Sequence, residues 1–157
     1  MSLVAEYRAA RRGEDIARLR RVLALRAMAA TGMSQRYIAA ALGITQPAVS
    51  QQLKFAPDLN LVHPETLVAA AAPVLRALAV QRGYTRLAVF GSVARRAARP
   101  DSDIDLLVDA PEGTSSFGFI GFKQLLEHVL GREIDLVSYG GLKPTLDDDI
   151  RREAVLL

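Results

Sequence analysis

Apolar residues in the first third of the chain recur three or four positions apart, which is the spacing of α-helices that bury one face. The pattern predicts a first helix over residues 14–32, a second over residues 34–43 and a third over residues 45–54. Residues 1–13 carry no such pattern, and we expect them to form a mobile start. The first part of the chain is therefore predicted to be all-helical.

The remainder of the chain changes to short apolar runs typical of buried strands. Residues 55–63 lack periodicity and are predicted to be a linker, and a helix follows over residues 64–81, where Pro73 must either kink or break it. The next elements are strands over 86–90, 104–108 and 133–137, a helical turn over 93–98, and helices over 117–130 and 145–154. The predicted fold is α+β, with an all-α domain over residues 1–62 and a small mixed-sheet domain over residues 63–157.

Charge is divided along the same boundary. Residues 1–62 have a net charge of +5 and residues 63–157 a net charge of −2, which indicates a part that faces a polyanion and a part that carries metal. The chain has no cysteine, which excludes disulfides and thiolate metal sites. No apolar run approaches the length of a membrane span, and the start lacks the pattern of a signal peptide, so we expect a cytoplasmic protein without a membrane partner.

Two acidic residues stand at the start of the second predicted strand. Asp103 and Asp105 are two positions apart, so in a strand their side chains project from the same face beside Gly91 and Ser92. Two ionised carboxylates repel unless a cation lies between them, and carboxylate oxygens suit Mg²⁺ or Mn²⁺. The glycine and serine offer N–H groups and a hydroxyl to phosphate oxygens. This combination indicates chemistry on a nucleoside triphosphate.

The second and third predicted helices are joined by the four-residue turn 42–45, which contains a glycine, and this arrangement resembles the helix-turn-helix of bacterial repressors. By that resemblance the third helix enters the major groove. The residues expected to contact bases or phosphates are Arg36, Thr45, Gln46, Ala48, Gln51, Gln52 and Lys54. Operator binding of this kind is expected from a dimer with two half-sites. The alternative is a three-helix unit that only packs on a partner.

The spacing G-S-x10-D-x-D, together with Asp135 on the third predicted strand, resembles the minimal nucleotidyltransferase branch of the polymerase-beta-like superfamily. The resemblance implies that Asp103, Asp105 and Asp135 are the catalytic residues and hold two Mg²⁺ ions, with Asp135 completing one metal site or acting as the base. It also implies that Gly91 and Ser92 bind the β- and γ-phosphates of ATP, with Arg95 neutralising phosphate charge. Arg96 stands where the family commonly has glycine, which leaves the conformation of this loop open.

Proteins that resemble this one are often antitoxins, which silence a HEPN-type toxin by transferring AMP from ATP to a toxin tyrosine and repress their own operon. The resemblance thus implies a protein adenylyltransferase that forms a homodimer or a hetero-oligomer with the toxin. One alternative is a repressor that uses an inactive nucleotidyltransferase fold to sense nucleotide or to grip a partner. Another is a nucleotidyltransferase that modifies a small molecule such as an antibiotic.

Overall fold

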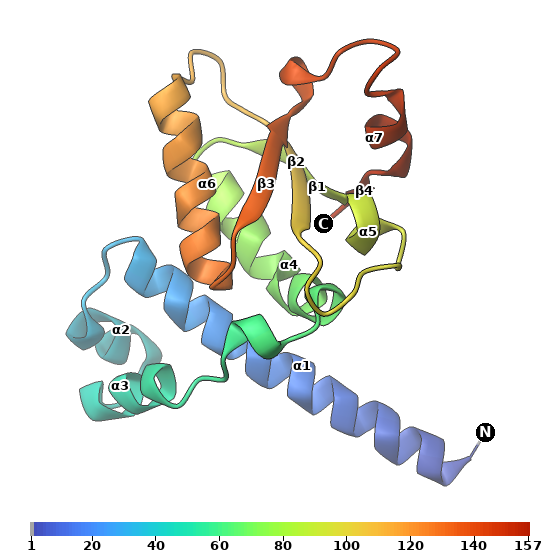
Figure 1. Ribbon diagram of the computed structural model, residues 1–157. Helices are drawn as coiled ribbons and strands as arrows, with labels where there is room; N and C mark the ends of the chain where they lie inside the picture. Colours follow the sequence, from blue (N-terminus) through green and yellow to red (C-terminus); the bar gives the residue numbers. More distant parts are fainter. Residues whose placement is uncertain (1) are drawn as a thin grey trace.

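A mixed four-stranded sheet forms the centre of the C-terminal part of the chain in a computed structural model, which describes residues 2–157 (Figure 1). Its strands are β1 (Thr85–Phe90), β2 (Ile104–Asp109), β3 (Ile134–Ser138) and β4 (Val155–Leu156), in the order β3-β2-β1-β4. β1 runs antiparallel to β2 and to β4, whereas β2 and β3 are parallel. The α+β class with a mixed sheet is confirmed.

Helices cover one face of this sheet (Figure 1). The helices are α1 (Leu3–Ala30), α2 (Gln35–Leu42), α3 (Gln46–Lys54), α4 (Pro64–Gln81), α5 (Gly91–Ala94), α6 (Ser116–Leu130) and α7 (Asp148–Glu153), with short 3-10 turns η1 (Leu59–Leu61) and η2 (Tyr139–Gly141). α4 and α6 pack on the face formed by side chains such as Leu87, Val89 and Leu106. The opposite face carries only a small apolar cluster in which Phe90 and Leu107 contact Leu142, and this is the more open side of the sheet.

The first helix is longer than predicted. α1 begins at Leu3, where the hydroxyl of Ser2 accepts a hydrogen bond from the N–H of Ala5, and it runs for 28 residues. The expectation of a mobile start is therefore wrong for residues 3–13, and residue 1 lies outside the described residues. The reason is local propensity, since alanine and arginine, which dominate this segment, are strong helix formers even where no face is buried.

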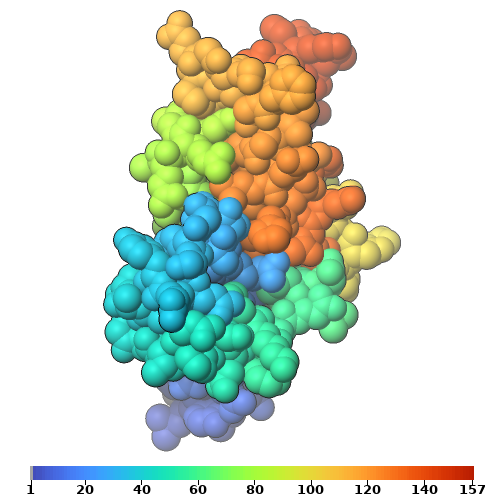
Figure 2. Space-filling view, turned by 90° about the vertical axis from the view of Figure 1, so that its left-hand side faces the viewer, coloured from blue at the N-terminus to red at the C-terminus, as the bar shows by residue number. Residues whose placement is uncertain are grey.

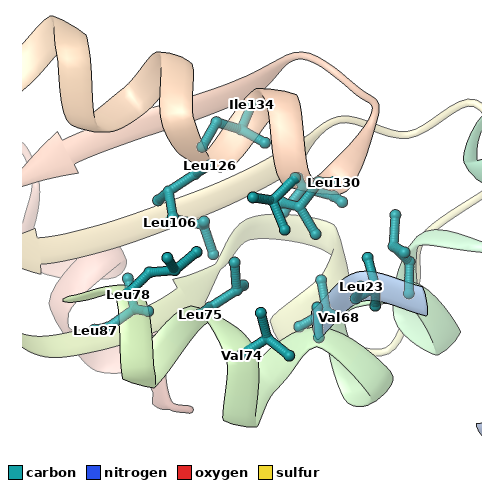
Figure 3. Close-up of a cluster of buried hydrophobic side chains, with 14 of the residues drawn as sticks. Leu23, Val68, Val74, Leu75, Leu78, Leu87, Leu106, Leu126, Leu130 and Ile134 are labelled. Atoms are coloured by element: carbon teal, nitrogen blue, oxygen red, sulfur yellow. The ribbon is translucent and has the colours of Figure 1, made fainter. Parts of the chain in front are cut away.

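Helix α1 is shared by two hydrophobic cores. Leu19 and Leu23 belong to the main core, and Figure 3 shows Leu23 beside Val68 of α4. Leu25, which lies on another side of α1, packs in a second core with residues of α2 and α3, among them Val49. The helical lobe of α2 and α3 is thus joined to the sheet through the body of α1 (Figure 2).

The segment predicted to be a linker is packed rather than free. It contains η1, and its Leu59 is 4% exposed and belongs to the main core. Nearby, Arg26 of α1 donates hydrogen bonds to the carbonyl oxygens of Val129 and His128 at the end of α6, at 2.9 and 2.7 Å, where a cation complements the helix dipole. These contacts fix the position of the helical lobe relative to the sheet.

The structure also defines the course of α4, the start of α7 and a short last strand. α4 continues through Pro73 without a break. The closing helix starts at Asp148, because Thr145 adopts a left-handed backbone with φ 76° that a helix cannot contain. The chain then adds β4, a strand too short for its pattern to be recognised, on the free edge of β1. Within residues 2–157 no helix combines the length and apolar character needed to cross a membrane.

Candidate active site

Two of the predicted carboxylates, those of Asp105 and Asp135, lie side by side on neighbouring strands of the sheet. In the parallel register of β2 and β3, Asp105 lies directly opposite Asp135, and the antiparallel register of β1 and β2 places Phe90 opposite Asp105. The chain leaves β1 at Phe90 and turns straight into Gly91, the first residue of α5. Strand pairing therefore brings two of the predicted acids and the glycine-serine bend to one place.

Only glycine fits at position 91. Its φ of 70° is a left-handed conformation that other residues rarely adopt, and a Cβ atom at this position would overlap Oδ2 of Asp105. The carboxylate of Asp105 thus lies against the backbone of the bend. The role predicted for Gly91, which is to bind phosphate oxygens, stays a prediction, since the group beside it in this structure is a carboxylate of the same chain.

The carboxyl of Asp105 is held in an environment that disfavours its charge. Partial burial is the largest cause, followed by a hydrogen bond with Asp135 and by the negative charges of Asp135, Asp103 and Glu153, and together they raise the pKa of Asp105 to about 6. The Asp105 carboxyl therefore keeps its proton to a higher pH than an ordinary aspartate does. A divalent cation would relieve the same repulsion.

Asp103 and Asp135 lie at the surface beside Asp105. Asp103 immediately precedes β2, and its charge is felt by Asp105, while Asp135 occupies an exposed position on β3. Oxygen ligands of this kind suit Mg²⁺, so the chemistry of the three side chains fits a divalent cation. Among residues 2–157, however, no three acidic or histidine side chains are gathered closely enough to form a ready-made metal site.

Glu153, which the sequence analysis did not single out, completes the bend. It lies at the end of α7, and its carboxylate accepts a hydrogen bond of 2.9 Å from the N–H of Gly91 and forms an ion pair of 2.8 Å with Arg95. Partial burial opposes its ionisation, but the Arg95 hydrogen bond, the Gly91 N–H and the charge of Arg95 hold the pKa of Glu153 below its usual range. The sequence carries no signal for this role, because 62 residues separate the partners.

The structure places Ser92 and Arg95 on α5 and directly after it, with Ser92 half-buried and Arg95 exposed. Arg95 is engaged with Glu153, so in this arrangement it holds the bend rather than standing free for phosphate. Arg96 adopts φ 56°, the left-handed conformation that glycine favours. The loop thus keeps the backbone expected of a glycine at this position, with the strain carried by an arginine.

Helices α2 and α3 form the predicted pair, with Ser34 and Thr45 as caps and Gly43 in a left-handed turn. Five of the predicted DNA-contacting residues are exposed, namely Arg36, Thr45, Gln46, Gln51 and Lys54, whereas Ala48 and Gln52 are half-buried. Thr45 also caps α3 by accepting a hydrogen bond from the N–H of Ala48, and the Gln46 side chain donates a hydrogen bond of 2.7 Å to Gln35. Most of the predicted set is thus on the surface of α2 and α3.

Known proteins share the fold and the sequence of this region. The family model described as a nucleotidyltransferase domain matches residues 75–157. A Thermococcus cleftensis protein named protein adenylyltransferase MntA is 37% identical over 97 residues, which are 62% of this chain and 95% of that protein. A Methanocaldococcus jannaschii protein with the provisional name of a protein adenylyltransferase is 42% identical over 76 residues, 48% of this chain and 82% of that protein.

A solved structure, provisionally described as a minimal nucleotidyltransferase, matches with a TM-score of 0.55 and 43% identity, covering 61% of this chain and 97% of its own. The fold and site therefore define a nucleotidyltransferase. The chain belongs to the nucleotidyltransferase domain family, which confirms the class of enzyme predicted from Gly91, Ser92 and the three aspartates. Residues 1–74, with the helical lobe, lie outside the family match.

We expect Asp105→Asn to stabilise the metal-free protein at pH 7. The folded-state pKa of Asp105 is about 6 against an ordinary 3.8, so the folded protein binds its proton more tightly, and stability is lost as the pH rises from about 4 through 6. After discounting for solvent, the variant should gain about 1 to 2 kcal/mol at pH 7 and nothing near pH 4. Denaturant unfolding in chelator-treated buffer measures this. Asp101→Asn is the control, and an unstabilised Asp105→Asn protein at pH 7 would contradict the electrostatic account.

We expect Glu153→Ala to lower the free energy of unfolding by about 1 to 2 kcal/mol, because it leaves the buried Gly91 N–H without its acceptor and Arg95 without its partner. Glu153→Gln keeps an acceptor and should lose about half as much. Asp149→Ala breaks a largely exposed ion pair with Arg152 and is the matched control, with an expected loss of less than about 0.5 kcal/mol. Equal losses from Glu153→Ala and Asp149→Ala would contradict the role of Glu153.

Proposed function

We propose that this chain transfers AMP from ATP to a hydroxyl group of a partner protein, with release of pyrophosphate. The observation that carries the proposal is the pair Asp105 and Asp135, aligned across β2 and β3 beside the Gly91 bend. Membership of the nucleotidyltransferase domain family supports nucleotidyl transfer, and the names of two relatives support a protein as acceptor.

Asp103, Asp105 and Asp135 are proposed to hold two Mg²⁺ ions. When bound, the cations stabilise the charge that develops on the triphosphate and lower the pKa of the attacking hydroxyl. The raised pKa of Asp105 supports this assignment, because a carboxyl that resists its own charge gains most from a cation.

In the proposed reaction the acceptor oxygen forms a bond to the α-phosphorus while the bond from that phosphorus to the bridging oxygen breaks. The electron pair of the broken bond leaves with pyrophosphate, and Asp135 accepts the proton of the hydroxyl. Gly91 and Ser92 are proposed to bind the β- and γ-phosphates through an N–H group and a hydroxyl, with Arg95 adding positive charge. This requires the phosphates to displace the Glu153 carboxylate from the Gly91 N–H and from Arg95. Exposure of Asp103 and Asp135 supports a protein acceptor, because a hydroxyl on another protein can reach them.

The proposed acceptor is a tyrosine of a HEPN-type toxin, which makes this chain an antitoxin. The proposed second activity is operator binding by α2 and α3. Its support is the pair of capped helices around Gly43, the net charge of +5 over residues 1–62, and the exposure of Arg36, Gln51 and Lys54. Autoregulation of this kind would couple the supply of the antitoxin to its own concentration.

Incubation with α-labelled ATP, Mg²⁺ and the product of the neighbouring gene is expected to label that product. Asp103→Asn, Asp105→Asn and Asp135→Asn should each lower the rate by roughly two to three orders of magnitude, since each removes stabilisation of transition-state charge. Asp101→Asn, in the turn before the site, should retain the wild-type rate. Labelling that survives Asp105→Asn would refute the mechanism, and no labelling by any variant or by the wild type would favour an inactive fold.

DNA selected from a random pool by the wild-type protein tests the second activity. Arg36→Ala is expected to weaken binding to all sequences and to reduce the slope of log K against log salt by about 1, because it removes one phosphate contact. Gln51→Ala should relax base preference at one position by about 1 to 3 kcal/mol. Arg82→Ala, at the end of α4, is the control for loss of charge alone. Binding without sequence preference would contradict a role as an operator reader.

A further inference from the structure

The first turns of α1 project from the rest of the molecule as an uncovered arm, which we define as residues 3–15 (Figure 1). Every residue of the arm is exposed, and Leu3, Val4 and Tyr7 are 87%, 57% and 68% exposed. In Figure 2 these turns emerge beneath the lobe of α2 and α3. An isolated helix of this length is marginal in water, so an arm with apolar residues at its tip is expected to be covered.

A groove of about 520 Å³ lies between α1 and α4, beyond the base of the arm. Its α1 side is formed by residues such as Ala17, Arg20 and Ala24, and its α4 side by Val74 and Ala77. Arg20 and Ala17 are exposed, and the lining is otherwise largely apolar. The groove can therefore accommodate apolar side chains, and the guanidinium of Arg20 lies at its rim.

The tip of the arm and the groove lie on the same side of α1. Leu3, Ala10, Ala17 and Ala24 are spaced by seven residues, which is nearly two full helical turns. A second helix laid along this side would contact the apolar tip at one end and the groove at the other. The apolar tip and the groove therefore lie on one face of α1 but at different ends of it. They cannot contact each other within one copy.

We propose that α1 pairs antiparallel with α1 of a second copy of this chain, about a two-fold axis near Gly13. Each copy then places Leu3 in the groove of the other, so the same contact forms twice. Gly13 suits the axis because it has no side chain and nothing else in residues 2–157 lies within 4 Å of where a Cβ would stand. The opposing helices can approach most closely there.

The charges along α1 fit this arrangement. Glu6 lies seven residues before Gly13 and Arg20 seven residues after it, so with Gly13 at the centre Glu6 of one copy lies opposite Arg20 of the other. This pair occurs twice by symmetry. A parallel pairing in register would instead set Glu6 against Glu6 and Arg20 against Arg20, which repel. Charge complementarity therefore selects a second copy and an antiparallel orientation.

Charge exchange between copies tests the proposal independently of nucleotidyl transfer and DNA binding. The wild type is expected to sediment as a dimer, whereas Glu6→Arg and Arg20→Glu alone should each weaken dimerisation at least about tenfold, because each creates two like-charge pairs. An equimolar mixture should restore the dimer, since both copies then regain opposite charges at each contact. These residues are exposed, so each variant should fold as the wild type does, which circular dichroism checks.

The absence of cysteine from the chain allows a direct test of register. Copies with Ala10→Cys mixed with copies with Ala17→Cys should form a mixed disulfide under mild oxidation, whereas Arg8→Cys, which lies on the far side of α1, should not form one with Ala17→Cys. A monomeric wild type at every concentration, or a dimer that the charge-exchanged mixture fails to restore, would overturn the proposal. So would a dimer that crosslinks equally through Arg8→Cys. Loss of labelling activity with the dimer intact would instead concern the nucleotidyltransferase site alone.

Discussion

The site depends on one electrostatic constraint: Asp105, with Asp103 and Asp135 near it, is held in a partly buried position against the backbone of Gly91. Like charges this close to one another destabilise the fold in the absence of a cation. They stay close because the register of β1, β2 and β3 fixes the positions of these residues in the sheet. The raised pKa of Asp105 is the measure of the constraint.

The Gly91 N–H and the Arg95 guanidinium, which lie beside the carboxylates, are held by residues near the C-terminal end of the chain. Strand β4 pairs with the edge of β1, and Glu153 just before it bonds the N–H of Gly91 and the guanidinium of Arg95. The C-terminal segment therefore sets the shape of the bend. The contacts with Glu153 hold both groups in place beside the carboxylates.

The N-terminal helices are part of the same structural unit rather than an appendage. Leu23 of α1 is buried in the main core and Leu25 in the core of the helical lobe, so the lobe moves with the sheet. The proposed pairing of α1 between two copies would then fix two nucleotidyltransferase sites and two α3 helices relative to each other. Partner modification and DNA binding would share one rigid frame.

Much of this protein was determined by local sequence. Helix periodicity, the capping residues Ser34 and Thr45, and the spacing from Gly91 to Asp103 and Asp105 depend on short-range chemistry, so they predicted the α+β class, the helix pair and the family. Sequence also carried the position of α4 but could not tell that it continues through Pro73, because a proline permits either outcome until packing on both faces decides.

Only the tertiary structure decided the contacts between distant segments. Glu153 accepts a hydrogen bond from Gly91, which is 62 residues away in the sequence. Leu59, in the segment predicted to be a linker, is buried in the main core. Strand β4 forms by pairing with the edge of β1. None of these has a local signature, since each depends on which surfaces the folded chain brings together. Sequence thus determined which side chains can perform the chemistry, and the register of the strands decided that they meet, because backbone hydrogen bonding aligns Asp105 with Asp135.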